Sequence, residues 1–147
     1  MKKYLLILII GIAIFGFVKQ APRFFFNTRF FSSESSNSDI VIENAFKKRQ
    51  NNIQVGGSGK VVKILPDDTQ GSRHQKFIIQ LNSGQTLLIA HNIDIAPRIS
   101  PLKIGDHIIF YGEYQWNPNG GVVHWTHHDP GDRHEGGWLS HNGKMVQ

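Results

Sequence analysis

The sequence contains no cysteine among its 147 residues. Disulfide bridges, thiolate metal sites and a thiol nucleophile are therefore excluded. The larger part of the chain also lacks net charge: residues 51–147 carry eight Lys and Arg against eight Asp and Glu, whereas residues 1–50 carry eight against three. The formal charge of +5 thus belongs to the N-terminal third. We expect no general electrostatic attraction between the remaining part and nucleic acid.

The apolar runs of the sequence are short. The longest spans residues 4–18, fewer than the roughly 20 residues of a typical membrane-spanning helix. It follows Lys2 and Lys3 and ends at Lys19, and this order of basic and apolar segments is typical of an export signal. The sequence therefore predicts a short signal-anchor, with a cleaved signal peptide as the alternative.

This N-terminal segment divides the chain into three parts. We predict a signal-anchor or signal peptide over residues 1–22, a flexible tether over residues 23–38 and a folded domain over residues 39–147. The predicted partner of residues 4–18 is a bacterial inner membrane, with the domain facing the periplasm or the cell exterior. Cleavage of the signal would instead give a secreted or periplasmic protein.

The domain has the pattern of an all-β protein. From Val55 onward, apolar residues recur at every second position in short runs separated by turn-forming residues. A short helix is expected before the strands at residues 40–49, with Ser38 or Asp39 as its cap, and another in the segment 92–106. Strands are expected at Gly59–Leu65, Gln75–Leu81, Gln85–His91, His107–Trp116 and Val122–His128, followed by a hairpin at Asn142-Gly143.

These elements favour a small barrel. Five or six strands with an insertion between the third and fourth match an oligonucleotide/oligosaccharide-binding (OB-like) barrel better than a sandwich. Gly112 lies in the fourth predicted strand, where the absence of a side chain permits the sharp coiling that closes a barrel. An SH3-like barrel is the alternative.

The stretch from residue 120 to residue 141 contains five of the eight histidines. If Trp116 pairs with Val122, strand alternation places His124 and His127 on opposite faces of the fifth strand. Beyond that strand, a glycine-containing loop would return a later histidine to the strand end. The predicted catalytic group consists of His127, His128, Asp129 and His134.

Three kinds of chemistry fit this group. His128, Asp129 and His134 are residue types that bind zinc, so a divalent metal such as zinc is one predicted cofactor. A histidine oriented by Asp129 would act as an acid or base without a metal, with Arg133 or Arg98 holding an anionic oxygen. In the third alternative, these side chains close the barrel end through hydrogen bonds.

Further residues are expected to contact a ligand. The segment "IAHNIDIAPRI" ends the third predicted strand, near the face where OB-like barrels bind ligands, although a capped turn is the alternative. The acidic turn at Asp67 and Asp68 resembles that of staphylococcal-type thermonucleases, but the arginines and glutamate of that family have no matching run here. The predicted ligand-binding residues are His91, Asp94, Arg98, Tyr114, Trp125 and Arg133.

The motifs "GSRHQKF", "IAHNIDIAPRI", "GEYQWN" and "HWTHHDP" together resemble a bacterial family catalogued as domain of unknown function 3465. The resemblance covers about two-thirds of the chain and extends to its C-terminus. It implies the layout of an N-terminal export or anchor segment followed by one domain. It implies no biochemical activity for this chain, because the family has no established biochemical function.

Composition and motifs lead to three functional hypotheses. In the first, the His/Asp-rich site binds or hydrolyses an anionic, phosphodiester-like ligand. In the second, the domain is a non-enzymatic envelope module that binds a glycan, peptide or protein through Tyr114 and the tryptophans. A structural domain whose histidines respond to mild acidity is a third alternative. Extended nucleic-acid binding is not favoured, since the domain has no net positive charge.

Overall fold

The computed structural model describes the backbone of residues 28–147 and the side chains of residues 36–147. The predicted signal or anchor segment, residues 1–22, lies outside this part of the chain. Within residues 28–147, no helix combines the length and the apolar character that crossing a membrane requires.

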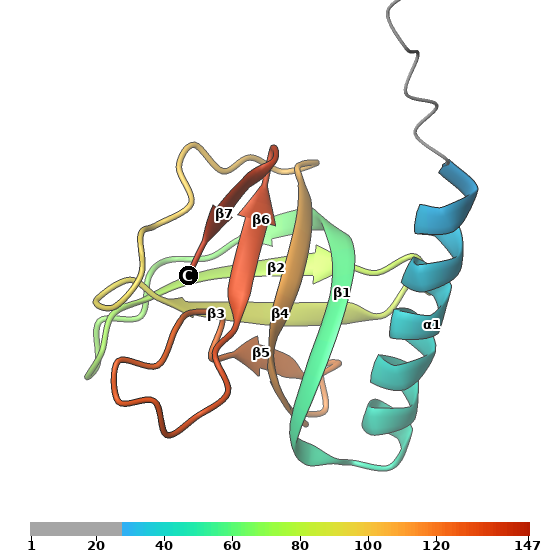
Figure 1. Ribbon diagram of the computed structural model, residues 1–147, viewed down its shortest axis with the longest axis horizontal. Helices are drawn as coiled ribbons and strands as arrows, with labels where there is room; N and C mark the ends of the chain where they lie inside the picture. The colour runs from blue at the N-terminus through green and yellow to red at the C-terminus, as the bar shows by residue number, and fades with distance from the viewer. Residues whose placement is uncertain (1–27) are drawn as a thin grey trace, which may run out of the picture.

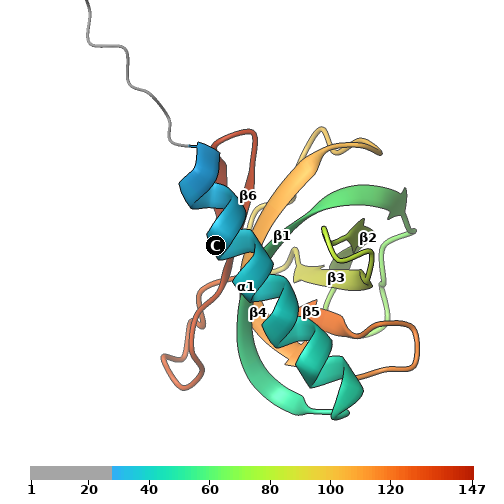
Figure 2. The same ribbon diagram turned by 90° about the vertical axis from the view of Figure 1, so that its right-hand side faces the viewer.

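The described chain forms one helix and seven strands around a closed five-stranded barrel (Figures 1 and 2). Around the barrel the strands follow the order β1-β2-β3-β5-β4, and β4 pairs back onto β1 to close the ring. The β3–β5 pair is parallel and the other pairs are antiparallel. The elements are α1 (Thr28–Lys47), β1 (Asn51–Ile64), β2 (His74–Gln80), β3 (Thr86–Asn92), β4 (His107–Gln115), β5 (Val122–His124), β6 (Trp138–His141) and β7 (Lys144–Val146).

The core lies inside this ring and follows from the two-residue alternation of the strands. In β2, β3 and β4, buried and partly exposed residues alternate along almost the whole strand, as expected when one face of each strand points inward. The largest fully buried side chains are aromatic or branched, and they include Phe77, Ile79, Leu87, Ile89, Phe110 and Tyr114. The prediction of an all-β barrel is confirmed.

Gly112, which was predicted to permit sharp coiling of β4, lies where β5 approaches closely. A Cβ atom at this position would lie 2.5 Å from the carbonyl oxygen of His124 in β5. Because that separation is far inside van der Waals contact, β4 and β5 pair at this point only with glycine.

The helix before the barrel is longer than predicted. It begins at Thr28, not near Ile40, so the serine-rich segment predicted as a flexible tether is helical in part. Asp39 does not cap the helix: it is buried, and its Oδ2 accepts a hydrogen bond of 2.9 Å from the backbone N–H of Ser83. Ile42 and Ala45 are fully buried in the core. Packing on the barrel end near the β2–β3 turn therefore overrides the weak helix propensity of the serines.

The predicted helix at 92–106 is not present. The connection between β3 and β4 is irregular, in keeping with Pro97 and Pro101 in its sequence. It closes the barrel end opposite α1, where the side-chain amide of Gln75 accepts from the backbone N–H of Ile99 and donates to its carbonyl, both at 3.0 Å. Buried backbone groups of the connection are thereby satisfied by a side chain.

The predicted register between β4 and β5 is wrong by one residue. Val122 pairs with Gln115, not with Trp116, and His124 pairs with Glu113. The connection contains Gly120 and Gly121, both with positive φ, and this tight turn fixes the pairing. A shift of one residue exchanges the faces of a strand, so the predicted neighbours of His124 are also wrong.

The fifth strand is shorter than predicted: it ends at His124 and not at His128. Trp125 follows with φ of 53°, a left-handed conformation in which the strand cannot continue. The last hairpin is confirmed: Asn142 and Gly143, with φ of 51° and 75°, connect β6 and β7, as the preference of Asn-Gly for such turns predicts.

Candidate functional site

Asp129, the centre of the predicted catalytic group, closes its own loop and does not orient a histidine ring. Its Oδ1 accepts from the backbone N–H of Gly131 at 3.0 Å, and its Oδ2 accepts from those of Arg133 and His134 at 2.8 and 3.0 Å. These hydrogen bonds, from Gly131 above all, hold the pKa of Asp129 below its usual range. Both oxygens are thus engaged by backbone, and Arg133 contributes its N–H to the same turn.

The other members of the predicted group point to different places. His127 is buried, and its Nδ1 donates to the carbonyl of His128 at 2.8 Å. The side chain of His128 is 65% exposed and lies 3.5 Å from Asp132. In residues 28–147, no three His, Asp or Glu side chains are arranged to hold a metal ion. The zinc site predicted at His128, Asp129 and His134 therefore finds no support in the geometry.

His134 instead binds Glu113 on β4. Its Nε2 lies 2.7 Å from Oε2 of Glu113, its Nδ1 lies 2.7 Å from the carbonyl oxygen of Glu135, and its ring stacks on Trp125 at 4.1 Å. A ring that donates from both nitrogens must be the charged imidazolium. The hydrogen bond to Glu113 accordingly raises the pKa of His134.

Glu113 also faces His124, its partner in β5. Burial works to raise the pKa of Glu113, but hydrogen bonds from His134 and Gln115 outweigh burial and leave this pKa below its ordinary value. The Nε2 atom of His124 lies 3.2 Å from Oε1 of Glu113, yet it is buried without a hydrogen-bond partner. Burial lowers the pKa of His124, so His134 keeps its proton to a higher pH than His124 does.

The outward face of the barrel brings this pair together with residues of β2 and β3. Lys76 on β2 is paired with Ala90 on β3, and Ala90 follows Ile89, the parallel partner of Val123. The side chains of Lys76, Ala90 and His124 therefore form a row across three strands, on the face opposite the core. A hollow of about 260 Å³ opens over this row, and its lining residues are Asp68, His74, Lys76, Ala90, Gln115, Val122 and His124.

A second hollow lies one step along the same face. Ile78 pairs with Leu88, and Leu88 pairs with Val122, the residue that also borders the first hollow. The second hollow has a volume of about 200 Å³ and is lined by Leu65, Ile78, Thr86, Leu88, Asn117, Asn119 and Gly121. We refer to the two hollows together, with these lining residues, as the outer groove.

The sequence analysis missed most of the outer groove. His74, Lys76 and Ile78 occupy alternate outward positions of β2, and the same alternation that marks the core also marks this face. Strand alternation could therefore have identified the outward residues of β2 as part of a surface site. None of the predicted site residues lines the groove. Arg98 lines a separate small hollow at the β3–β4 connection.

His91 belongs to the core. It is fully buried, with Nδ1 2.9 Å from the hydroxyl of Thr126 and Nε2 3.1 Å from the carbonyl of Pro97. The Pro97 carbonyl accepts from Nε2–H, and in the neutral ring Nδ1 then accepts from the threonine hydroxyl. Burial lowers the pKa of His91 in the same sense. This histidine joins the β3–β4 connection to the barrel.

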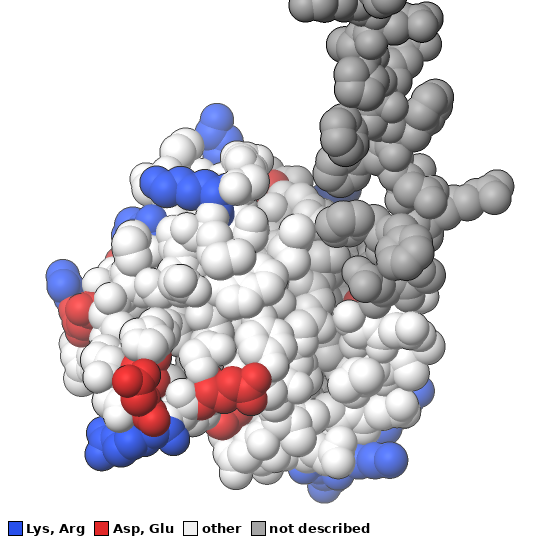
Figure 3. All heavy atoms as spheres, viewed as in Figure 1, with Lys and Arg blue, Asp and Glu red and all other residues white. Residues whose placement is uncertain are grey.

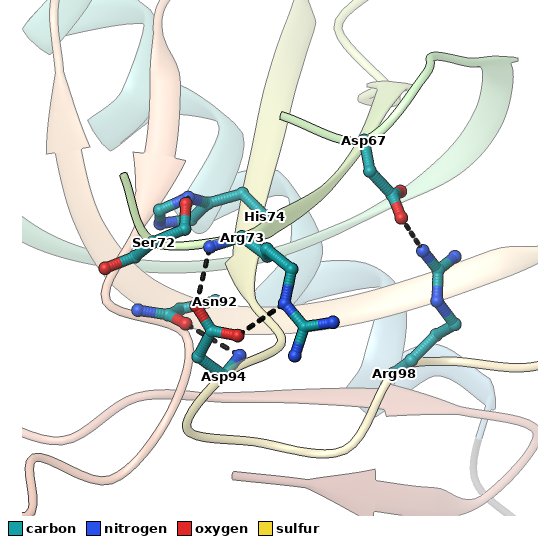
Figure 4. A network of polar contacts seen from close by, with 7 residues as sticks. All are labelled: Asp67, Ser72, Arg73, His74, Asn92, Asp94 and Arg98. Carbon is teal, nitrogen blue, oxygen red and sulfur yellow. Dashed lines mark hydrogen bonds and ion pairs between the residues drawn. The ribbon is translucent and has the colours of Figure 1, made fainter. Parts of the chain in front are cut away.

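Asp94 and Arg98 tie two loops together (Figure 4). The carboxylate of Asp94 accepts from the backbone N–H of Arg73 at 2.7 Å and from its Nε at 2.6 Å, which lowers the pKa of Asp94. Arg98 forms an ion pair with Asp67. Both contacts link the β1–β2 loop to the β3–β4 connection, so these residues are already occupied as a structural clamp.

The predicted aromatic contacts also have structural roles. Tyr114 is fully buried, and its hydroxyl donates to the carbonyl of Gly120 at 3.3 Å. Trp125 packs between the rings of His127 and His134. On the face drawn in Figure 3, Lys and Arg side chains lie apart near the edges and form no continuous basic patch.

Comparison with known protein families gives a match over most of the chain. A family model described as "Protein of unknown function (DUF3465)" matches residues 25–147, whereas a search of the curated proteins found no match. The matched region contains the whole barrel, α1 and both hollows of the outer groove. The chain therefore belongs to the DUF3465 family, a family of unknown function.

Proposed function

We propose that this domain is a non-enzymatic binding module that holds an oligosaccharide in the outer groove. The observation that carries the proposal is the position of the two adjoining hollows over β2, β3 and β5. Their walls come from the β1–β2 loop, through Asp68, and from the β4–β5 connection, through Asn117 and Asn119. We infer an OB-like barrel from the strand order, and such barrels bind oligosaccharides or oligonucleotides on the face of strands 2 and 3, between these two loops.

The lining of the groove favours a sugar over a nucleic acid. Single-stranded nucleic acid is bound by a positively charged groove with aromatic side chains on which bases stack. The outer groove has no Phe, Tyr or Trp among its lining residues and only one lysine, which faces Asp68. It has amide, hydroxyl, imidazole and carboxylate groups around an apolar floor, and these can both donate and accept hydrogen bonds to hydroxyl groups.

Hydrolysis of an anionic, phosphodiester-like ligand is the second candidate. One observation favours it: His124 lines the groove with Glu113 behind it at 3.2 Å, and a carboxylate beside an imidazole is a common acid–base pair. Against it stands the engagement of Asp129 and of both His134 nitrogens in loop contacts. We therefore rank binding above catalysis.

We also propose that the module is exported and stays attached to a bacterial inner membrane through residues 4–18, facing the periplasm or the cell exterior. The support is the sequence of Lys2 and Lys3 followed by an apolar run. Membrane fractionation and N-terminal sequencing of the mature protein test this proposal. A mature N-terminus near Pro22 would show that the signal is cleaved.

The proposal is tested by titrating the full chain with a panel of oligosaccharides and measuring the NMR chemical shifts of the protein. We expect shifts at outward residues of β2, β3 and β5. Leu88→Gln removes apolar surface from the groove floor at similar volume and should weaken binding by about tenfold. Met145→Gln, at an exposed position of β7, is the matched control. Shifts confined to other faces, or equal losses in both variants, would reject the groove as the site.

A further inference from the structure

We propose that the hollow over Ala90 is a subsite for an anionic group of the ligand, a carboxylate or a phosphate. This inference rests on the proposed function, because it assigns a role to one end of the outer groove. It selects acidic oligosaccharides as the class that the groove takes.

The hollow exists because Ala90 is small. Its neighbours in the row, Lys76 on one side and His124 on the other, have long side chains that rise above the sheet. The next outward residue of β3 is Leu88, which forms the floor of the second hollow. A branched side chain at Ala90 would occupy the space between Lys76 and His124, and the core would be unchanged since this position points outward.

Nitrogen donors face the hollow from two strands. The Nζ atom of Lys76 lies 3.8 Å from Oδ2 of Asp68, which is too long for a hydrogen bond. His74 donates from Nδ1 to the carbonyl of Ser72 at 2.7 Å, and this fixes its ring beside the hollow. The His124 side chain lines the hollow from β5, and its Nε2 atom is buried 3.2 Å from Oε1 of Glu113.

The hollow is lined by one lysine, one carboxylate and two histidines. Burial lowers the pKa of His124, and the nearby rings of His134 and His74 act in the same direction. The carboxylates in the neighbourhood are Asp68, in long contact with Lys76, and Glu113, which is engaged by His134. An anion above Ala90 would complete the coordination of Lys76 and favour the protonated state of His124.

The first experiment uses inorganic phosphate as the probe of the subsite, with NMR detection on the full chain. We expect saturable shifts at His74, Lys76 and His124. Lys76→Met keeps the aliphatic stem and removes the charge, and it should weaken phosphate binding by at least about tenfold. Lys76→Arg should restore it. Lys144→Met, a lysine on β7 outside the groove, is the matched control and should bind as the unmodified chain does.

The second experiment compares an oligogalacturonate with its methyl ester, which has the same sugar chain without the charges. We expect tighter binding of the acid, and loss of that preference in Lys76→Met but not in Lys144→Met. Ala90→Leu should abolish the preference by filling the hollow, whereas Ala90→Ser should retain it. Circular dichroism spectra of each variant confirm that the barrel is folded.

The outcomes separate the two proposals. Equal affinities for acid and ester, with shifts in the groove, would leave the binding module intact and overturn the anionic subsite. Phosphate shifts that depend on Lys76, without binding of either sugar, would support the subsite and count against an oligosaccharide ligand. If phosphate causes no chemical-shift changes in the protein, or causes the same changes in Lys76→Met, the result shows an adventitious ion only and overturns the subsite.

Discussion

Glu113 lies between two histidines in different states. His134 donates to it from Nε2 while its Nδ1 donates to a backbone carbonyl, so the ring is charged, whereas burial lowers the pKa of His124. The charged pair fastens the loop between β5 and β6 to the outer face of β4. The contact is therefore an electrostatic anchor whose strength depends on pH.

Glu113→Gln should lower the pKa of His134, because the amide no longer stabilises the imidazolium as a carboxylate does. An NMR titration of the His134 ring resonances measures this change. Since the pKa of His134 in the folded state lies above 6.5, its contribution to stability is full below that pH and is lost as pH rises through the folded-state pKa.

Glu135→Gln is the control for this measurement. It retains the backbone carbonyl that accepts from His134 and alters the carboxylate that accepts from Tyr111. The pKa of His134 should therefore stay raised in this variant. An unchanged pKa in Glu113→Gln would contradict the assignment of the anchor.

At the scale of elements, α1 is part of the barrel core and not an appendage. Ile42 and Ala45 are fully buried, and Asp39 holds the β2–β3 turn. The helix covers one end of the barrel in Figure 2, and the β3–β4 connection closes the other. A five-stranded ring of this size needs both covers, because the inward side chains at its ends would otherwise meet water.

Ile42→Ala should lower the free energy of unfolding by roughly 2–5 kcal/mol, since it removes buried methyl groups and leaves a cavity. Chemical denaturation measures the change. Val41→Ala is the matched control on the exposed side of the same helix, where the side chain is 52% exposed, and its effect should stay within about 0.5 kcal/mol. Comparable losses in both variants would mean that α1 does not pack through Ile42.

Element by element, the sequence was informative where the signal is local. Alternation located most of β2, β3 and β4, and Asn142-Gly143 located the last hairpin. The extent of α1 and the register of β5 depend on contacts with distant residues, which a pattern of neighbours does not contain. The contact between His124 and Glu113 could not be predicted, because this pairing follows from the turn at Gly120 and Gly121.

At the scale of the whole molecule, buried and hydrogen-bonded ionisable groups make the fold sensitive to acid. The pKa values of His91 and His124 are lowered by burial. Such groups take up protons more readily in the unfolded chain, so the stability they contribute is present above 6.5 and falls as pH decreases below it. His134 acts in the opposite sense, at higher pH.

The free energy of unfolding should therefore fall between about pH 7 and about pH 5. His91→Gln should reduce the slope of this fall, because an amide can replace both hydrogen bonds of the neutral ring without titrating. Denaturation curves over this pH range test the prediction. His107→Gln, at an exposed position at the start of β4, is the control and should leave the slope unchanged. An identical slope in His91→Gln would show that His91 does not control the acid sensitivity.

The pairing of β1 with β4 has a consequence for the order of folding. It joins Asn51 to Gln115 and Lys60 to His107, so the seam that closes the ring connects residues far apart in the sequence. Domains dominated by such non-local pairs fold slowly, on the scale of about milliseconds to seconds. The ring also cannot close while β4 is still being synthesised. The chain must therefore emerge through β5 before its barrel forms, which leaves an interval in which the earlier strands are still unfolded.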